Sequence, residues 1–522
     1  MPSDSLADWN LTDKLQDRRQ RVPAIETCVL SLIAHKKRAT MNWQDHLAKF
    51  WPHLAAGFSF LASLLASIHA VLNKRDSRAA ALWLGFIWLL PFLGPVLYLA
   101  LGVNRIRRHA LSLRIGRAQG DASLRPIPDD MGEPHRLEAE HLRMLARMVD
   151  RVAKRPLVAA NRVQALVNGD EAFPAMLAAI EDATLSVSLA TYIFDNDRCG
   201  NQFAGALARA VTRGVQVRVL IDDAGARYSW PSIVGRLRRA GMPVARFLPT
   251  LAPWRLTTIN LHNHRKILVT DGRIGFTGGI NIREGNVLTN KPRRPVQDLH
   301  FKVEGPVVTQ LQEAFADDWA FCTKEILDGD AWFPELKECG NVIARVITDG
   351  PEVDLDKLRW TLLGALSCAQ TSVRILTPYF LPDQSLITSL NLAVLRGVQV
   401  DIILPSKNNL PVLHWASRAM WWQVLERGCR IWLTPPPFDH AKLMIVDNHW
   451  VFLGSANWDP RSLRLNFELN VECYGRDFAG KMEAIVQNKL RGAKPVTLEE
   501  VDRRPLPVRL RDGVARLFTP YL

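Results

Sequence analysis

The sequence predicts an α/β protein of two tandem α/β/α halves related by a pseudo-two-fold axis, preceded by an N-terminal transmembrane helical hairpin. Two features carry this prediction: two long charge-free runs near the N-terminus, and four blocks of sequence that return later in the same order. The length of 522 residues is enough for three or four domains. The hydrophobic content of 48% supports packed cores and excludes a disordered chain.

The hairpin is predicted from two runs that contain no Asp, Glu, Lys or Arg. They cover 50–73 and 79–104, which are 24 and 26 residues long, and a helix needs roughly 20 apolar residues to cross a bilayer. The segment 82–101 is apolar on every face, which favours a membrane helix over a core helix. Pro91 and Pro95 should kink the second helix, as membrane helices tolerate. A signal peptide is disfavoured because the first run starts late and a second follows it directly.

The flanks of the hairpin are more basic than its short loop. Nine Lys and Arg residues lie in the flanks 36–49 and 105–117, whereas the loop holds Lys74, Arg75 and Arg78. The positive-inside rule then places both flanks, and all that follows residue 104, in the cytoplasm. Seven cysteines without a paired spacing agree with a reducing compartment.

The rest of the chain is dominated by an internal repeat. "EDATLSVSLATYIFDND" (181–197) is similar to "SCAQTSVRILTPYFLPD" (367–383), and "RGVQVRVLID" (213–222) to "RGVQVDIILP" (396–405). "HRKILVTDGRIGFTGGIN" (264–281) returns as "HAKLMIVDNHWVFLGSAN" (440–457), and "DLHFKVEG" (298–305) as "ELNVECYG" (468–475). Each half alternates helices with apolar strands, as α/β layered domains do. We therefore expect matching sites of the two halves to face each other.

These features divide the chain into six predicted segments. They are an N-terminal segment (1–49), the membrane hairpin (50–104), a basic linker (105–160), the first half (161–335), the second half (336–485) and a basic C-terminal tail (486–522). The apolar positions of 137–152 have helical spacing, so this part of the linker is expected either to lie on anionic lipid or to be a solvated helix. The tail is expected either to be a solvated extension or to contact anionic headgroups. Met41, just before the hairpin, is an alternative start of translation.

A His and a Lys stand two residues apart in each copy of the third block. They are His264 with Lys266 and His440 with Lys442, and strand periodicity places each pair on one face. The imidazole offers a nucleophile or proton carrier beside a fixed cation, and cationic clamps stabilise phosphoryl transition states. A single HxK pattern is not evidence for a catalytic site. Two copies of HxKxxxxD, each followed at fixed spacing by Gly-Gly/Ser-x-Asn, predict a catalytic site.

Asp271 and Asp447 complete the two candidate catalytic motifs. Asp271 is followed by Gly272, a strong hairpin-turn signal, and Asp447 by Asn448. Strand parity points both carboxylates away from the His/Lys face. We therefore expect them to brace the turns.

A nucleophilic imidazole needs an acceptor that holds its other nitrogen. The fourth repeated block supplies a carboxylate in each half, and alignment of the repeats assigns Asp298 to His264 and Glu468 to His440 as orienting residues.

Small and amide side chains follow each motif, and they are the candidate phosphate-binding residues: Gly279, Asn281, Ser455 and Asn457. The small residues permit close approach of an anion, and the amides are donors. His262 lies near His264, but Phe438 holds the matching place, and no Cys or carboxylate cluster completes a metal site. No metal and no other cofactor is expected.

The net charge of +14 suits an anionic partner, either nucleic acid or an anionic membrane. The predicted hairpin favours lipid, so no nucleic-acid partner is expected.

The doubled HxKxxxxD motif resembles the phospholipase D superfamily over residues 160–485. "TYIFDND", "TPYFLPD", "GSANWDPRSLRLNFELN" and the N-terminal hairpin are together similar to bacterial cardiolipin synthases. The resemblance implies two phospholipase-D-like halves that join two phosphatidylglycerols into cardiolipin and release glycerol, without metal or nucleotide. It also implies a multi-pass protein of the bacterial inner membrane, with its catalytic part on the cytoplasmic side and anionic phospholipids as its partners.

The resemblance further implies a phosphohistidine on one motif His, while the other protonates the leaving glycerol and then activates the incoming hydroxyl. The first-motif His is the usual nucleophile, which would be His264. Asp298 has one methylene less than Glu468, so as the predicted partner of His264 it should hold that ring more rigidly. Two other functions remain open: a phospholipase-D-type hydrolase of phospholipids or another phosphodiester, and a membrane-anchored scaffold that binds anionic lipid. The two complete motifs argue against the scaffold.

Overall fold

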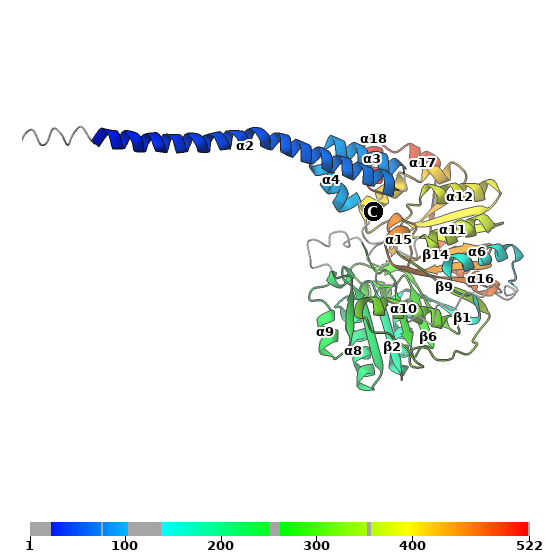
Figure 1. Cartoon of the computed structure of the whole chain (residues 1–522). Coiled ribbons are helices and arrows are strands. Elements are labelled where there is room, and N and C mark those ends of the chain that lie inside the picture. The colour runs from blue at the N-terminus through cyan, green and yellow to red at the C-terminus, as the bar shows by residue number, and fades with distance from the viewer. Residues whose placement is uncertain (1–21, 75–76, 103–136, 250–260, 352–355, 520–522) are drawn as a thin grey trace, which may run out of the picture. The chain divides into compact units, whose positions relative to one another are not determined.

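The computed structural model describes residues 22–74, 77–102, 137–249, 261–351 and 356–519, and Figure 1 shows it as a ribbon. The chain divides into two compact units, Met1–Asn104 and Arg105–Leu522. The first unit contains the predicted membrane segment, and the second contains the repeated halves.

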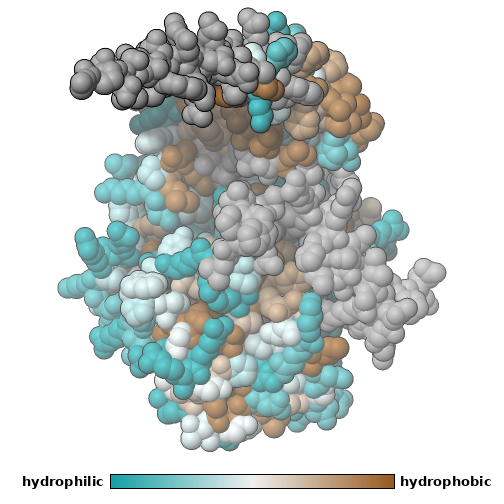
Figure 2. Space-filling view, turned by 60° about the vertical axis from the view of Figure 1, so that its left-hand side comes forward, coloured by the Kyte–Doolittle hydropathy of each residue, from teal (hydrophilic) through white to brown (hydrophobic). Residues whose placement is uncertain are grey.

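The first apolar run belongs to one long helix, α2 (Val22–Asn73). Its segment Lys49–Asn73 is the one described helix that is long and apolar enough to cross a membrane. At 1.5 Å per residue, these 25 residues extend about 37 Å, more than the ~30 Å of bilayer hydrocarbon. Large apolar side chains such as Phe58 and Leu72 are exposed on it. Figure 2 shows apolar surface as brown patches on one face of the molecule.

The second apolar run does not form the one continuous helix, long enough to cross a membrane, that we predicted. It forms α3 (Ser77–Leu89), α4 (Leu93–Leu97) and the π-helical turn η1 (Tyr98–Gly102). The break falls at Pro91, which lacks an amide donor, and at Phe92, which has a φ of 71°. The run folds back along α2, with the rings of Phe60 and Trp88 5.6 Å apart. The structure therefore shows one candidate span, and a hairpin of two membrane-crossing helices is not shown.

The second unit begins with two helical segments and continues with the first half. These elements are η2 (Glu140–Leu142), α6 (Arg143–Ala153), β1 (Val158–Val167), α7 (Asn168–Asp182), β2 (Ser186–Thr191), α8 (Arg198–Thr212), β3 (Gln216–Asp222), η3 (Gly225–Arg227), α9 (Val234–Arg239), β4 (Val244–Phe247), β5 (Ile267–Thr270), β6 (Ile274–Gly278), η5 (Glu284–Asn286), η6 (Leu288–Asn290), β7 (Val296–Gln297), β8 (Leu299–Glu304) and α10 (Val308–Thr323).

The second half repeats this order and is followed by three further elements. The elements are β9 (Val342–Asp349), α11 (Lys357–Cys368), β10 (Ser372–Leu376), α12 (Gln384–Leu395), β11 (Gln399–Pro405), α13 (Pro411–Arg418), α14 (Trp422–Leu425), β12 (Arg430–Thr434), β13 (Phe438–Asp439), β14 (Leu443–Val446), β15 (Trp450–Gly454), α15 (Pro460–Arg464), β16 (Glu468–Tyr474), α16 (Arg476–Arg491), β17 (Lys494–Val496), α17 (Leu498–Asp502) and α18 (Leu506–Leu517).

Fifteen strands of the second unit form one continuous sheet, in which β1 of the first half pairs antiparallel with β9 of the second. Outward from this central pair, one side runs β1-β8-β6-β5-β2-β3-β4 and the other β9-β16-β15-β14-β10-β11-β12. The two sides have the same strand order, as expected for halves related by a pseudo-two-fold axis. The sheet is therefore shared by the halves.

Helices cover both faces of this sheet. The core of the first half packs α7 and α8 against one face, and that of the second half packs α11 and α12 in the equivalent place. A third core contains α10, α16 and strand residues from both halves. Because this core spans the boundary, it fixes the two halves against each other, which the geometry of a shared site requires.

The described part of the linker, from residue 137 on, and the described part of the tail both pack against the second half. The apolar face of α6 packs in the core of the second half, with Leu145 and Val149 fully buried. This segment therefore neither lies on lipid nor is a solvated helix. In the tail, β17 extends the sheet beside β12, and α18 packs on α13.

Candidate active site

Two short backbone connections join the halves next to the motif histidines. Asn263 forms a parallel bridge with Phe467, and β13 pairs in parallel with β7 at the equivalent place. The amide of His264 donates to the carbonyl of Phe467 (2.9 Å), and the amide of His440 donates to the carbonyl of Gln297 (2.7 Å). Each motif thus starts against the segment that leads into the carboxylate of the other half.

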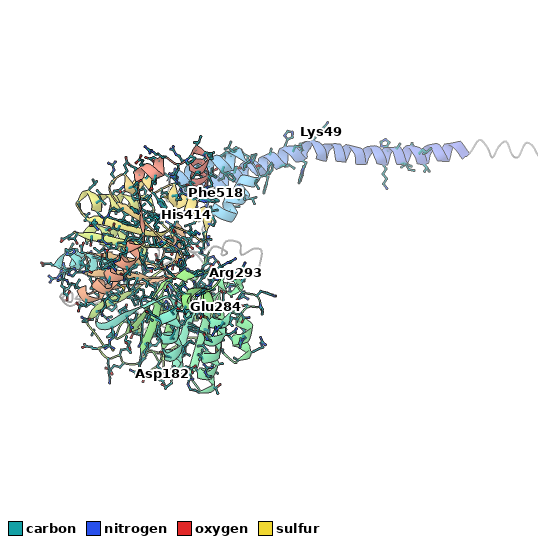
Figure 3. All side chains as sticks on the ribbon, turned by 180° about the vertical axis from the view of Figure 1, so that it is seen from behind. Lys49, Asp182, Glu284, Arg293, His414 and Phe518 are labelled. Carbon is teal, nitrogen blue, oxygen red and sulfur yellow. The ribbon has the colours of Figure 1, made fainter. Side chains whose placement is uncertain are left out.

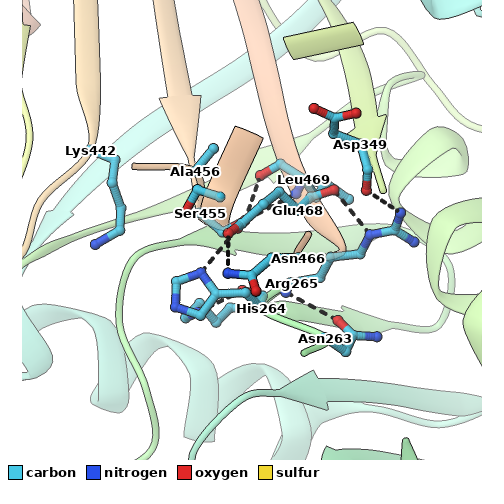
Figure 4. Close-up of polar contacts among 12 residues, drawn as sticks. Asn263, His264, Arg265, Asp349, Lys442, Ser455, Ala456, Asn466, Glu468 and Leu469 are labelled. Atoms are coloured by element: carbon cyan, nitrogen blue, oxygen red, sulfur yellow. Dashed lines mark hydrogen bonds and ion pairs between the residues drawn. The ribbon is translucent and has the colours of Figure 1, made fainter. Parts of the chain in front are cut away.

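As a result, each imidazole is held by the carboxylate of the opposite half. His264 Nδ1 lies 3.0 Å from Glu468 Oε2, which Figure 4 shows, and His440 Nδ1 lies 2.8 Å from Asp298 Oδ2. The predicted pairing within each half, Asp298 with His264 and Glu468 with His440, is wrong. Alignment of repeats identifies equivalent residues but not which copy each one contacts. The parallel connections bring the residue after Phe467 or Gln297 beside the histidine of the other half.

The two imidazoles face one pocket. Their ring centroids are 6.5 Å apart, and because Nδ1 of each ring is engaged, Nε2 is left for chemistry. Burial, together with the nearby ammonium groups of Lys266 and Lys442, lowers the pKa of His264. Burial and the same ammonium groups hold the pKa of His440 well below its usual value. The neutral form of both rings is therefore favoured in the free protein.

The two orienting carboxylates have different surroundings. Glu468 accepts additional hydrogen bonds from Ser455 Oγ (2.5 Å) and Asn466 Nδ2 (3.1 Å). Burial alone would raise the pKa of Glu468, but His264, Lys266 and the hydrogen bond from Ser455 lower it. The Oδ1 atom of Asp298 accepts from the backbone amide of Leu299 (2.8 Å), and burial raises the pKa of Asp298 to about 6. Glu468 is thus a firmly ionised acceptor, whereas Asp298 titrates near neutrality.

Both motif lysines are buried behind the histidines. Lys266 Nζ donates to the carbonyl of His264 (2.6 Å), and Lys442 Nζ to that of His440. Burial lowers the pKa of Lys266 to about 7 and that of Lys442 to about 8. Neither ammonium lines the pocket, so the lysines act on it through their charge, as their effect on both imidazoles indicates.

The motif aspartates brace turns and do not reach the pocket. Asp271 accepts from the amides of residues 184–186, and Asp447 from those of residues 370–372. His141 also bonds to Asp447, with Nε2 2.8 Å from Oδ2. Asp271 and Asp447 have φ of 50° and 53° in the β5–β6 and β14–β15 turns. The expectation that these aspartates brace the turns is confirmed, and their carboxylates do not line the pocket.

The four candidate phosphate-binding residues divide into two kinds. Asn281 and Asn457 line the pocket. Gly279 and Ser455 instead lie behind it, against the orienting carboxylates. Ser455 donates to Glu468, and a Cβ at Gly279 would come within 2.1 Å of Asp298 Oδ1. These two small residues therefore make room for the carboxylates and are not placed to bind phosphate directly.

The pocket has a volume of about 470 Å³ and is lined by both halves. The first half contributes mostly polar side chains, among them Tyr192, His262 and Arg283. The second half contributes polar side chains such as Asp459 and Arg461 and also an apolar segment, 410–413, together with Phe438. His262 Nδ1 lies 3.5 Å from Asp222 Oδ1. In the described part of the chain, no group of three or more His, Cys, Asp or Glu side chains could hold a metal ion.

Comparison with known proteins agrees with this geometry. The family model "Cardiolipin synthase, PLD-like domain" matches residues 176–319 and 362–490, and "Phospholipase_D-nuclease N-terminal" matches 61–102. Cardiolipin synthase A of Pseudomonas syringae pv. syringae (strain B728a) is 33% identical over 89% of this chain and 97% of its own length. The chain belongs to the cardiolipin synthase family. Cardiolipin synthase of Geobacillus sp. (strain WCH70) is 31% identical over 90% of this chain and 94% of its own length.

The fold of this cardiolipin synthase family member is also similar to a solved structure. The crystal structure of phosphatidylserine synthase of Haemophilus influenzae Rd KW20 matches with a TM-score of 0.58 and 15% identity. It covers 72% of this chain and all of that chain. At this identity the likeness shows the shared fold of two phospholipase-D-like halves.

Several pocket residues of the family member were missed at the sequence level. Tyr192 packs its ring 5.2 Å from that of His264, and Tyr379 lies 6.2 Å from His440. Asp459 lines the pocket, and burial raises its pKa to about 6. Tyr192 and Asp459 stand inside the quoted blocks "TYIFDND" and "GSANWDPRSLRLNFELN", which is the signal that could have found them.

Proposed function

We propose that the protein joins two phosphatidylglycerol molecules into cardiolipin and releases glycerol, through an intermediate with the phosphatidyl group on His264. The observation that carries the proposal is the pair of carboxylate-held imidazoles that face one pocket with centroids 6.5 Å apart. A two-step transfer needs one nucleophile and one group that is first an acid and then a base. The apolar wall beside the pocket suits a lipid substrate.

In the first step, Nε2 of His264 attacks the phosphorus of one phosphatidylglycerol. A P–N bond forms, and the P–O bond to the headgroup glycerol breaks. Nε2–H of His440 donates its proton to the leaving oxygen, so glycerol departs neutral. Asn281 and Asn457 supply amide donors to the phosphate oxygens, and the charges of the two lysines stabilise the transition state.

In the second step, His440 is neutral and acts as a base. It takes the proton of the terminal hydroxyl of a second phosphatidylglycerol, whose oxygen attacks the phosphorus. The P–N bond breaks, cardiolipin leaves, and His264 returns to its starting state with His440 protonated again. No cofactor is needed for the balance of atoms and charge.

Substrate binding prepares His440 for the first step. The neutral form of both imidazoles is favoured in the free protein because burial and the lysines lower their pKa values. A phosphodiester anion offsets the repulsion from Lys266 and Lys442, which raises the pKa of the imidazole that receives the proton. The anionic substrate thus favours the protonated form of His440, which the first step requires.

The assignment of His264 as nucleophile has new support. The crossed pairing removes the argument from a short Asp298 next to His264. Glu468, the actual partner, is ionised and held by Ser455 and Asn466, which suits an imidazole that must keep its Nε2 lone pair available. Asp298, with a pKa of about 6, suits the ring of His440 that repeatedly gains and loses a proton.

Product analysis tests the reaction. The full chain in phosphatidylglycerol bilayers should convert radiolabelled phosphatidylglycerol to equal amounts of cardiolipin and glycerol. Phosphatidic acid as the main product would show a phospholipase-D-type hydrolase. Lipid binding without turnover would show a scaffold.

We further infer that both apolar runs lie in the bacterial inner membrane, with the catalytic unit in the cytoplasm. The excess of basic residues in the flanks and the return of α3 along α2 support this topology. In intact cells, Ser77→Cys at the start of α3 should react with a membrane-impermeant maleimide, and Cys339 should react only after permeabilisation. Reaction of Cys339 in intact cells would overturn the topology.

A further inference from the structure

The outer face of α18 is apolar although it faces solvent. Leu506, Leu510, Val514, Leu517 and Phe518 recur at helical spacing along one side, and Leu506 and Leu517 are 75% and 72% exposed. An ordinary surface helix shows the opposite pattern, with its apolar side chains toward the core. These five residues are called the outer stripe of α18.

The inner face of α18 is fixed to the second half by different residues. Ala515 is buried in a small cluster with Leu413 and Ala416 of α13. Asp512 is fully buried and accepts from Arg504 (2.7 Å) and Arg511 (2.6 Å). In Figure 3, His414 of α13 and Phe518, directly after α18, are labelled on neighbouring parts of the ribbon. The outer stripe is therefore held rigidly outward.

The cluster beneath α18 continues into the wall of the active-site pocket. Leu413 and Tyr379 belong both to this cluster and to the pocket lining, and Phe438 packs against the cluster. Beside them Leu410 and Val412 line the pocket and remain exposed. The apolar surface at the pocket rim is thus connected through α13 to the helix that presents the outer stripe.

Arginines flank the outer stripe, and an exposed tryptophan stands two residues after a residue of the pocket lining. Arg509 and Arg516 are exposed along one edge of the outer stripe. On the first half, Tyr228 lines the pocket, and Trp230, two residues further, is 97% exposed. Exposed leucine and flanking arginines together match the chemistry of a surface that rests on anionic lipid.

We propose that the outer stripe of α18, with Leu410 and Val412 at the rim, docks into the interface of an anionic phospholipid bilayer and presents the pocket to it. The choice of a bilayer rests in part on the proposed lipid substrate and on the candidate span Lys49–Asn73 in the same chain. Docking would let a lipid pass from the bilayer along the apolar rim to the histidines without crossing water.

A depth measurement tests docking without turnover. The full chain is reconstituted in nanodiscs of phosphatidylglycerol and phosphatidylcholine, with a nitroxide on Leu517→Cys and, as control, on Ile326→Cys. Both positions are 72% exposed, and Ile326 follows α10 of the first half. The signal of the labelled parent protein is subtracted because the chain has native cysteines. At Leu517 the label should collide more with oxygen than with a water-soluble nickel chelate, and at Ile326 the order should be reversed.

Two results would overturn docking in this experiment. One is a Leu517 label as accessible to the nickel chelate as the Ile326 label. The other is a Leu517 label shielded from both reagents while mass photometry shows two chains per disc, which would identify a second copy as the occupant of the outer stripe.

A second pair of variants links docking to activity. Leu517→Glu should lower the rate on bilayer phosphatidylglycerol by about tenfold, because a buried leucine contributes about that much to partitioning, while Ile326→Glu should not. Both should retain the parent rate on short-chain phosphatidylglycerol dissolved as monomers. An equal loss on both substrates would show a structural role and overturn the proposal. If the parent protein forms no cardiolipin, the proposed function fails, while the depth measurement still decides docking.

Discussion

His264 and His440 are held by carboxylates of unlike character. Glu468, which holds His264, also accepts from Ser455 and Asn466, and its pKa lies below the usual value. Asp298, which holds His440, has Gly279 where the other half has Ser455, and burial raises its pKa to about 6. The two copies of the site thus differ in the residues behind the histidines, while the histidines stay the same.

Loss of either histidine should cause the largest loss of activity. His264→Ala and His440→Ala should each lower turnover by roughly 10⁴-fold or more. The two histidines act as one catalytic unit, so the loss of either one removes most of the activity of the pair. The two variants should differ in what they accumulate. Mass spectrometry of His440→Ala after exposure to phosphatidylglycerol should find a phosphatidyl adduct on His264, and His264→Ala should carry none. An adduct on His440 would reverse the assignment.

Removal of the charge from the orienting carboxylates should have the next largest effect. Glu468→Gln should lower kcat by roughly 10³-fold, since an ionised acceptor that fixes a catalytic imidazole can contribute up to about 10⁴-fold. Asp298→Asn should cost less, roughly 10²-fold, because Asp298 is the less firmly ionised of the two carboxylates, with burial raising its pKa to about 6. Steady-state rates, with thermal melting as the control for folding, would measure the difference. Equal losses would show that the two carboxylates are equivalent.

The pH dependence of kcat/KM should also distinguish the two carboxylates. Asp298 gains a proton below about pH 6, and Lys266 and Lys442 lose theirs above about pH 7 and 8, so kcat/KM should fall on both sides. Bound phosphate stabilises the ammonium forms, which should move the alkaline fall of kcat to higher pH than that of kcat/KM. The fall of kcat/KM at acid pH should disappear in Asp298→Asn and remain in Glu468→Gln. A profile in which the two variants lose the same limb would contradict the assignment.

The motif aspartates should give the smallest effect on chemistry and a clear effect on stability. Asp447→Ala should lower the free energy of unfolding by about 3 kcal/mol, and Asp271→Ala by about 1–2 kcal/mol, because several backbone amides lose their acceptor. The larger value belongs to Asp447 because its side chain is 3% exposed and also bonds to His141. Denaturant unfolding would measure both. A large fall in kcat at unchanged stability would show that the carboxylates act on substrate.

Much of this site could be predicted from the sequence, because the repeat marks the equivalent histidines, lysines, amides and carboxylates. The turn signals that follow Asp271 and Asp447 also predicted correctly that these residues brace the turns. The crossed pairing could not be predicted, because it depends on which copy of a segment each motif meets in space. Arg265 shows this: its guanidinium bonds to Asp318 of its own half and to the carbonyl of Glu468 in the other, while the matching residue is Ala441.

Other features needed tertiary packing to become visible. Pro91 predicted a kink, but the sequence does not show that the second apolar run would divide into α3, α4 and a π-helical turn. The helical spacing in 137–152 predicted α6, yet its apolar face could have met lipid, solvent or protein. It meets α11 of the second half, because that half leaves an apolar surface which a helix before the repeat covers.

The exchange of carboxylates between halves has a consequence for how such a chain could arise. A single half would leave its imidazole without an acceptor, but two copies of one half that associate through the β1–β9 edge would complete both pairs at once. A homodimeric ancestor could therefore have been active before any gene fusion. Once the copies were covalently joined, positions such as 279 and 455 no longer had to carry the same residue. One polypeptide could then evolve distinct donor and acceptor sides.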